Sequence, residues 1–523
     1  MQATDESEYT DPVLNTCREI FGIPYPYPWQ RLIIASVLDA ALPAAGVFED
    51  YEKLRQIAVL PTGAGKSLCW MLPAVLIDGI TVAVFPLLSL MADQKRRLDE
   101  AGINSVTLQG GLSRDEKTRL WSVLESHQVN IVLANPEILL SPEVSRRLEL
   151  LKPSFLVVDE THTVSQWGES FRPACGELGS LVEKWNPRAV LALTATAGPQ
   201  IRERLTELLF NGEKPAEALA NPDRPEIHYG VLPALSRNNT LERLIKSESH
   251  PAIVFGSTRS SVERAARMLR SRLGSNEIRF YHAGLSREEK SRLEKWFMNS
   301  TEGVLCATCA YGMGVDKKNI RTVIHLAPPA STEAYLQESG RASRDGKGAN
   351  AWLIWTPDDI AETGLKTDES AVAAGRRQSM LSYITSTSTC RRDMLLKALG
   401  IEAGDCSGCD VCGGEPRKKP STENLVLRTL RWNNFRFRKG QAARVLIGRK
   451  SAEIRRKGLD TLRGFGVLFG WELEDAEEAI SVLLRSGKLY YRRWGPGKGR
   501  IGINKHRRNS HSFGKCNLKS YFS

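Results

Sequence analysis

The sequence predicts a chain of the α/β class, in which two parallel-sheet lobes precede a helical cysteine-rich segment and a small basic domain. Two series of short apolar runs, each alternating with amphipathic helical patterns, predict the two lobes. A cluster of cysteines and a basic C-terminal fifth mark the remaining parts. The 523 residues suffice for three or four domains with separate cores.

The first lobe is expected within residues 1–210. Its expected strands lie at 57–60, 81–85, 130–133, 155–158 and 189–193. Residues 68–92 are nearly all apolar and could be mistaken for a membrane span. Asp78, Gly79 and two prolines interrupt them, so this stretch predicts a buried helix, a turn and a buried strand. The acidic, polar start of the chain predicts no export signal.

A phosphate-binding loop is predicted at Leu60-Pro-Thr-Gly-Ala-Gly-Lys-Ser67, between an expected strand and an expected helix. Backbone N–H groups at a helix N-terminus bind phosphates, a lysine neutralises them and a serine hydroxyl can ligate magnesium. The loop departs from the strict pattern because Leu60 stands in place of the first glycine. The predicted nucleotide-binding residues of this loop are Thr62, Gly63, Gly65, Lys66 and Ser67.

An acidic pair, Asp159 and Glu160, ends the expected strand 155–158 within the sequence Asp-Glu-Thr-His. Asp159 is suited to holding magnesium and Glu160 to polarising an attacking water molecule. The alternative is an ordinary surface turn. The preceding phosphate loop and the Thr-Ala-Thr triplet at 194–196 favour the catalytic interpretation.

Two arginines in the second lobe, Arg341 and Arg344, are predicted to complete the ATP site from almost three hundred residues away. Arginine forks suit the spread charge of a transferring γ-phosphate and act when a second lobe closes. This lobe is expected within 211–358, after a polar hinge at 211–221. Its expected strands lie at 252–255, 278–281, 303–306, 322–325 and 351–354.

Four cysteines within the helical segment 359–415 have the spacing C-x15-C-x2-C-x2-C. Two overlapping C-x2-C turns and a distant fourth thiolate can close a tetrahedral zinc site, whose role would be structural. The alternative is four free thiols in a reducing compartment. The predicted zinc ligands are Cys390, Cys406, Cys409 and Cys412.

The segment after residue 415 carries all of the net positive charge, with 26 Lys and Arg against 8 Asp and Glu. This concentration indicates a polyanionic partner, most simply nucleic acid; the alternative is a basic, partly disordered tail. Residues 416–504 form the expected domain, which ends in two β-rich runs around Gly-Pro-Gly. These runs predict a hairpin with basic arms and interleaved aromatic residues.

The motifs, taken in order, resemble those of superfamily 2 helicases and specifically of the RecQ family. The resemblance also rests on Gly312-Met-Gly-Val-Asp316 and on Gln337-Glu-Ser-Gly-Arg-Ala-Ser-Arg-Asp-Gly346. It spans roughly residues 15–500 and implies two RecA-like lobes, a helical zinc-binding subdomain and a small winged-helix domain. It further implies an ATP-dependent DNA helicase that moves 3′ to 5′ in DNA repair and recombination.

The resemblance assigns roles to individual positions of this sequence. Gln30 would read adenine, and Arg341 and Arg344 would contact the γ-phosphate, with Arg344 as the arginine finger. Asp316 and Gln337 would lie at the interface between the lobes and link the nucleotide to DNA.

An aromatic-rich loop after the acidic box resembles the RecQ loop that senses single-stranded DNA and couples it to ATP hydrolysis. Trp167 and Phe171 can stack on bases, and Arg172 can reach a phosphate. The alternative is that these aromatic side chains pack between the lobes. In the winged-helix-like part, Trp494 near the hairpin tip is the candidate strand-separating residue, and burial in the domain core is its alternative.

Five departures from the family pattern stand out, one of which is a longer loop leading to the phosphate loop. Thr161 replaces the usual alanine, Ser170 replaces an aspartate and Ser343 replaces a common glycine between the two arginines. Residues 25–29 read Tyr-Pro-Tyr-Pro-Trp where Phe-Arg-Pro-Gly precedes the glutamine in the family. No departure removes a group that does chemistry.

The last residues, 505–523, are expected to form a basic flexible tail. Leu518, Tyr521 and Phe522 resemble a degenerate sliding-clamp peptide, with a frayed tail as the alternative.

The sequence thus predicts a DNA helicase that uses ATP and Mg²⁺, contains Zn²⁺ and acts on single-stranded and forked or duplex DNA. One alternative is an ATP-gated DNA-binding or remodelling protein without strand separation, and another is an RNA helicase. No membrane association is expected. The expected location is the cytoplasm or nucleoid of a bacterial cell, or the nucleus of a eukaryotic cell.

Overall fold

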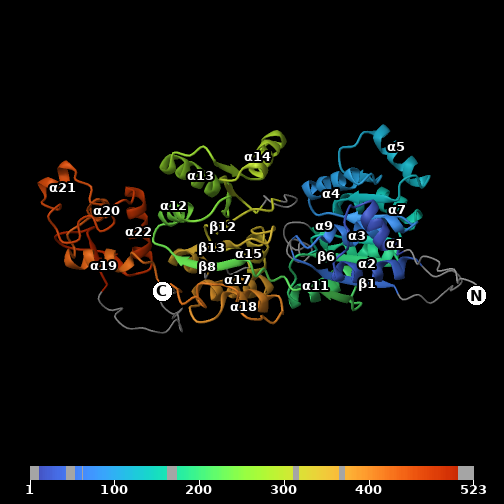
Figure 1. Cartoon of the computed structure of the whole chain (residues 1–523). Helices are drawn as coiled ribbons and strands as arrows, with labels where there is room; N and C mark the ends of the chain where they lie inside the picture. The colour runs from blue at the N-terminus through green and yellow to red at the C-terminus, as the bar shows by residue number, and fades with distance from the viewer. Residues whose placement is uncertain are drawn as a thin grey trace, which may run out of the picture.

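The computed structural model describes residues 11–42, 53–61, 63–161, 173–309, 317–363, 371–417 and 419–504. Figure 1 shows the first lobe in blue to green, the second lobe in green to yellow and helices α17 (Ala371–Thr385) and α18 (Arg391–Ala398), beside the cysteine turns, in orange beneath the second lobe. The C-terminal domain, in orange-red, lies against the second lobe on the side away from the first lobe.

The first lobe is a seven-stranded parallel sheet in the order β3-β4-β2-β5-β6-β1-β7. The strands are β1 (Leu54–Val59), β2 (Thr81–Val84), β3 (Val106–Leu108), β4 (Ile131–Ala134), β5 (Phe155–Val158), β6 (Ala189–Thr194) and β7 (Ala216–Leu219). The helices are α1 (Pro12–Glu19), α2 (Pro28–Ala41), α3 (Lys66–Leu76), α4 (Leu88–Glu100), α5 (Arg114–Glu125), α6 (Pro136–Leu139), α7 (Pro142–Leu150), α9 (Pro173–Gly176), α10 (Leu178–Trp185) and α11 (Pro199–Phe210).

Both faces of this sheet are buried, as its near-continuous apolar strands predict. Alternate residues of β1 show this: Ile57 and Val59 lie in one core with Leu205 of α11, and Ala58 lies in another with Trp70 of α3. The apolar stretch 68–92 forms most of α3, a turn and β2, which confirms the buried helix, turn and strand. Among the described residues, no helix is long and apolar enough to cross a membrane.

The second lobe is a six-stranded parallel sheet in the order β10-β11-β9-β12-β13-β8. Its strands are β8 (Ile227–Pro233), β9 (Ala252–Phe255), β10 (Ile278–Tyr281), β11 (Val304–Ala307), β12 (Thr322–His325) and β13 (Ala349–Trp355). Its helices are α12 (Arg237–Ser247), α13 (Arg259–Leu273), α14 (Arg287–Asn299) and α15 (Thr332–Ser339). The fold therefore confirms two parallel-sheet lobes.

The expected hinge at 211–221 contains a strand instead of only a linker. β7 pairs with β1 in parallel and forms one edge of the first sheet. The first sheet therefore extends to Leu219, and the connection to the second lobe begins after it.

Helices α16 (Pro357–Thr363), α17 (Ala371–Thr385) and α18 (Arg391–Ala398) follow the second sheet and precede the cysteine turns. The C-terminal domain then contains α19 (Glu423–Trp432), α20 (Lys439–Ile447), α21 (Ala452–Arg456) and α22 (Leu473–Arg485). It ends in the antiparallel hairpin of β14 (Leu489–Tyr491) and β15 (Ile501–Ile503), which confirms the predicted hairpin. This domain has its own apolar core, so the basic segment is not merely a tail.

Candidate active site

The phosphate loop joins the carboxyl end of β1 to the first residue of α3, as the sequence predicts. Gly65 caps α3 with a φ of +72°, a left-handed conformation that favours glycine. An added Cβ at Gly65 would also lie 2.4 Å from Nε2 of Gln30, so a larger residue would displace the Gln30 amide from the loop. Lys66 is the first helical residue and Ser67 the second. Thr62 lies outside the described residues.

Gln30 supports this loop through its side-chain amide. Its Nε2 donates hydrogen bonds to the backbone carbonyls of Ala64 and Gly65, each at 3.1 Å, and its Oε1 accepts one from the backbone N–H of Tyr27 at 2.7 Å. Both amide hydrogens are therefore committed to the loop. In this arrangement Gln30 holds the phosphate cradle, and adenine recognition would require it to exchange a partner.

The acidic pair lies at the end of β5, two strands away from the phosphate loop, with β6 between them. The carboxyl ends of neighbouring parallel strands meet at one edge, which is where α/β proteins bind nucleotides. Nζ of Lys66 lies 3.9 Å from Oε1 of Glu160, so the two predicted catalytic residues face each other. Asp159 is buried, and its Oδ1 accepts a hydrogen bond from the backbone N–H of Glu160 at 2.8 Å.

The backbone of the acidic box is held in an uncommon conformation. Glu160 has a φ of +49°, which is costly for a residue with a side chain. The next residue, Thr161, is fully buried, and its N–H and Oγ1 both donate to the carbonyl of Leu193, at 2.9 and 3.1 Å. The threonine that replaces the family's alanine thus anchors the box to β6. Close by in α3, burial raises the pKa of Cys69 to about 12, so this thiol packs as an apolar group.

The arginine segment of the second lobe reaches the phosphate loop of the first. An added Cβ at Gly63 would lie 3.9 Å from Cγ of Arg344, so the arginine side chain passes directly beside the loop. Arg341 is buried one turn earlier, where its N–H donates to the carbonyl of Glu338 at 3.3 Å. The structure therefore brings Arg344 to the loop across almost three hundred residues of sequence.

Gln337 lies at the boundary between the lobes, as expected from the resemblance. It lines a small cavity together with Pro61 and Thr196 of the first lobe and Gly340 of the second. Asp316, which was expected at the same boundary, lies outside the described residues. The aromatic-rich loop residues Trp167, Phe171 and Arg172, and the tail residues Leu518, Tyr521 and Phe522, also lie outside them.

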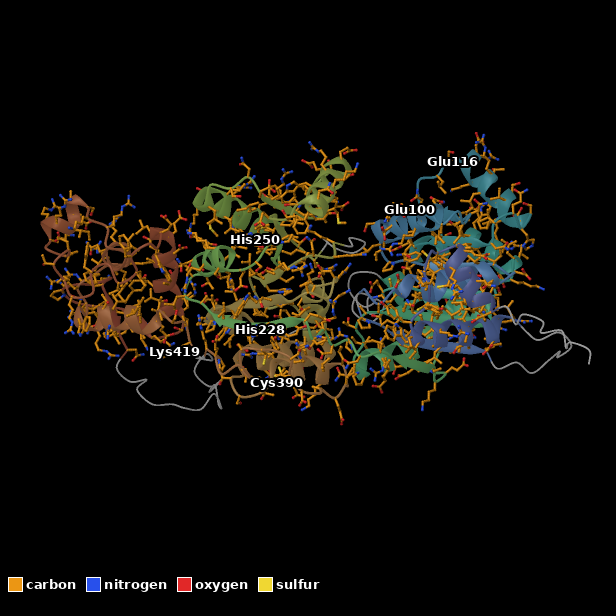
Figure 2. The ribbon with its side chains drawn as sticks, viewed as in Figure 1. Glu100, Glu116, His228, His250, Cys390 and Lys419 are labelled. Atoms are coloured by element: carbon orange, nitrogen blue, oxygen red, sulfur yellow. The ribbon has the colours of Figure 1, made fainter. Side chains whose placement is uncertain are left out.

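The four predicted zinc ligands come together in space. The sulfur atoms of Cys390, Cys406, Cys409 and Cys412 all lie within 4.8 Å of one another, and Sγ of Cys390 lies 4.0 Å from Sγ of Cys409. A zinc ion with four Zn–S bonds of ~2.3 Å needs sulfur–sulfur distances of about 3.8 Å, so the quartet fits this metal. Figure 2 shows Cys390 below His228 of β8, and Cys409 forms a β-bridge with the neighbouring Tyr229.

The hairpin of the C-terminal domain presents Trp494 to solvent. This side chain is 82% exposed, which excludes burial in the domain core. Its backbone carbonyl accepts a hydrogen bond from Nε of Arg492 at 3.2 Å. A second aromatic residue of this domain, Phe469, is 88% exposed and was not singled out from the sequence. Isolated aromatic residues in basic segments are its only sequence signal.

The sequence also gave no role to Arg224 or Gly198, which both lie at the boundary between the lobes. Arg224 donates to backbone carbonyls of the arginine segment, and Gly198 packs against the last residue of α18. The Asp-Arg-Pro sequence at 223–225 was a visible signal for the first. Nothing in the local sequence identifies the second.

The fold and this site define the class: a two-lobed helicase-type ATPase in which Arg344 of the second lobe lies beside the phosphate loop of the first. Family models match the chain in order: DEAD/DEAH box helicase at 29–204, helicase conserved C-terminal domain at 236–346, RecQ zinc-binding at 359–413 and RQC domain at 424–502.

Individual relatives narrow the class to a family. The chain is 30% identical to the ATP-dependent DNA helicase RecQ of Bacillus subtilis over 439 residues, covering 82% of this chain and 73% of that protein. It is also 30% identical to the protein of the same name from Pasteurella multocida, over 91% of this chain and 75% of that one. The chain belongs to the RecQ family of helicases.

Solved structures agree in fold. A DEAD-box helicase bound to single-stranded RNA and UDP-BeF matches with a TM-score of 0.54 and 16% identity, over 92% of each chain. The Mycobacterium smegmatis helicase Lhr, bound to single-stranded DNA and AMP-PNP, matches with a TM-score of 0.51 and 18% identity, over 95% of this chain and 61% of that one. At these identities the likeness concerns the fold alone.

Proposed function

We propose that this protein is an ATP-dependent DNA helicase that moves 3′ to 5′ along single-stranded DNA and separates the strands of duplexes. The observation that carries the proposal is the approach of Arg344, from the second lobe, to Gly63 of the phosphate loop. A triphosphate bound between them would tie its hydrolysis to relative movement of the lobes. The relatives are named ATP-dependent DNA helicases, which supports DNA as the substrate.

Each residue of the nucleotide site has a proposed role. Lys66 neutralises phosphate charge, and Ser67 and Asp159 are the residues that would hold a magnesium ion, which supplies further neutralisation. Glu160 orients and polarises the attacking water. Arg341 and Arg344 stabilise the charge that develops on the γ-phosphate. Thr62, Gly63 and Gly65 supply backbone to the phosphate cradle, and Gln337 and Asp316 link it to DNA.

DNA contacts are proposed on both the motor and the C-terminal domain. Trp167, Phe171 and Arg172 would sense single-stranded DNA, in keeping with the family resemblance. Trp494 would separate strands, which its exposure at the hairpin supports. The zinc quartet would stabilise the fold of its module and take no part in hydrolysis.

The decisive experiment compares 3′-tailed, 5′-tailed and blunt duplexes, in DNA and RNA versions, as substrates for ATP-driven unwinding. We expect unwinding of 3′-tailed DNA. ATP hydrolysis stimulated by DNA without strand separation would favour the remodelling protein, and unwinding confined to RNA would favour the RNA helicase.

Three variants test the proposed catalytic residues: Lys66→Ala, Glu160→Gln and Arg344→Ala. Each should lower DNA-stimulated turnover by at least ~10²-fold, because Lys66 and Arg344 neutralise charge in the transition state and Glu160 activates the attacking water, while DNA affinity stays within a few-fold of wild type. Arg147→Ala is the matched control, because, among the described residues, the guanidinium of this arginine contacts only Glu125 and Trp121 of the first lobe. Unchanged turnover in all three variants would reject the motor assignment.

A further inference from the structure

One arginine from the connection between the lobes holds the backbone that carries both catalytic arginines. Nη1 of Arg224 donates to the carbonyl of Gly340 at 3.1 Å. Nη2 of Arg224 donates to the carbonyls of Ala342 at 3.2 Å and Ser343 at 2.7 Å. A guanidinium presents its N–H groups in a rigid plane, so three simultaneous bonds fix the position of a turn. The bonded carbonyls flank Arg341 and immediately precede Arg344.

The turn needs such support because one of its residues is strained. Ser343 is fully buried and has a φ of +58°, in the left-handed region that L-residues avoid. Its N–H donates to the carbonyl of Ile320 at 2.9 Å, and its Oγ donates to the carbonyl of Lys347. Bonds from within the second lobe thus hold one side of the turn, and Arg224 holds the other.

The position of Arg224 is itself set by α18. Arg392 is almost completely buried, forms an ion pair with Asp223 and donates to the carbonyl of Arg224 at 3.0 Å. It also donates to the carbonyl of Ile227, at the start of β8, at 2.7 Å. One buried guanidinium therefore holds the Asp223 side chain and the backbone carbonyls of Arg224 and Ile227. Arg392 is the buried partner of this pair and Asp223 is partly exposed, so removing the carboxylate would leave a buried guanidinium without its counter-charge.

The same end of α18 is fastened to the cysteine quartet. Arg391 directly follows Cys390, is almost completely buried and pairs with Asp410 through bonds of 2.8 and 3.2 Å. Asp410 directly follows Cys409, and its Oδ2 accepts from the backbone N–H of Val231 in β8 at 3.2 Å. Two neighbouring buried arginines therefore connect the quartet, β8 and the connection between the lobes.

We propose that Arg224 is a positioning residue for Arg341 and Arg344. In this proposal the ion pair between Asp223 and Arg392, which lies in α18 next to the cysteine quartet, fixes the position of Arg224. The inference rests on the proposed function, because it assigns a role through Arg344. Arg224 donates to backbone carbonyls within residues 340–343, in the turn that carries the two arginines (the arginine turn). The proposal requires no contact between Arg224 and the nucleotide. Without it, one side of a strained turn loses three bonds. A displacement of a catalytic group by ~1 Å can lower the rate by about 10²-fold.

The test measures single-stranded-DNA-stimulated ATP hydrolysis by the full chain with Arg224→Ala, Arg224→Lys and Asp223→Asn. Arg224→Ala should lower kcat by about 10²-fold while the KM for ATP stays within threefold, since the phosphate loop is untouched. Arg224→Lys keeps the charge but loses the fork and should fall between Arg224→Ala and wild type. Asp223→Asn keeps the shape, removes the charge of the ion pair and should lower kcat about tenfold.

Arg485→Ala is the matched control, because this arginine pairs with Asp358 at a different domain boundary. Its kcat should match wild type. Zinc content and thermal unfolding are measured for every variant. If Arg224→Ala is insoluble or lacks zinc, the two conservative variants decide, and wild-type kcat in both would overturn the proposal.

A double-mutant comparison shows whether Arg224 acts through Arg344. In an Arg344→Lys background, measured by single-turnover phosphate release, Arg224→Ala should lower the rate by less than a further threefold. The same ~10²-fold loss in both backgrounds would mean independent action and overturn the positioning role. Wild-type turnover in Arg344→Ala together with Lys66→Ala and Glu160→Gln would instead reject the proposed function itself. Loss in Arg344→Ala with no loss in any Arg224 variant would reject only the positioning role.

Discussion

A single methyl group at Gly198 should slow the motor. Gly198 caps the N-terminus of α11 with φ −66° and ψ 170°, a conformation open to any residue, so the backbone itself does not require glycine. An added Cβ would lie 2.6 Å from the carbonyl oxygen of Ala398, the last residue of α18, and 3.8 Å from Oε1 of Glu333 in α15. An ordinary contact is about 3.4 Å, so α18 would have to retreat by ~0.8 Å.

This displacement of α18 would occur where the first lobe contacts α18 and α15. In the same contact Nη1 of Arg202 donates to the carbonyl of Leu399 at 3.4 Å, and Gly400 packs against Pro199. Overpacking of this size costs roughly 1–3 kcal/mol, and it applies only while the first lobe contacts α18 as it does in this structure. That corresponds to a loss of kcat between about fivefold and 150-fold. The KM for ATP should change little, because the phosphate loop lies within the first lobe.

The assay is steady-state ATP hydrolysis by Gly198→Ala at saturating single-stranded DNA. Gly375→Ala is the matched control, because it adds the same methyl group in α17 where, among the described residues, no atom outside the local helix backbone lies within 4 Å. The control should retain wild-type kcat. We infer that the contact between Gly198 and α18 must form for rapid turnover. A kcat within twofold of wild type for Gly198→Ala, in a correctly folded protein, would refute this inference.

Three further outcomes are expected. Cys409→Ser should lower the zinc content and solubility, whereas Cys309→Ser, which changes an exposed cysteine outside the quartet, should not; full zinc content in Cys409→Ser would reject the quartet. Trp494→Ala should slow unwinding but leave ATP hydrolysis and thermal stability unchanged, because the side chain is exposed; unwinding at the wild-type rate would reject its proposed role in strand separation. Gln30→Ala should weaken ATP and GTP binding equally, about tenfold or more, because two hydrogen bonds to the phosphate loop and one to Tyr27 are lost; a loss confined to ATP would show that Gln30 reads adenine.

Strands with a strong apolar run could be predicted from the sequence, and those without one could not. β9 and β10 begin and end where expected. β7, with the sequence Ala-Glu-Ala-Leu, lies at an edge and is largely exposed, so it carries no hydrophobic pattern. β8 contains a glycine and ends in proline, which read as breakers. Gly230 is needed in β8 because a Cβ there would lie 2.1 Å from the ring of Trp352.

The residues of the site also fall into a predictable and an unpredictable group, according to how far apart in the sequence the contacting residues lie. The phosphate loop, the acidic pair and the cysteine quartet combine short motifs with residue types that have few other uses, so their chemistry could be predicted. The supports of these motifs come from distant segments. Gln30 contacts the loop across 34 residues, and Arg224 contacts the arginine turn across 116 to 119. No local pattern encodes such contacts, and they become visible only in the fold.

Ser343 is both a departure from the family pattern and the central residue of the arginine turn. Its left-handed conformation costs an L-residue ~1–2 kcal/mol more than glycine. The bond from its Oγ to Lys347, which glycine could not make, offsets part of this cost, at roughly 0.5–1.5 kcal/mol. The bond from Arg224 to its carbonyl requires the turn to keep that conformation. The serine side chain therefore offsets part of the backbone strain through its own hydrogen bond. The direction of Arg344 is set by the backbone that Arg224 holds.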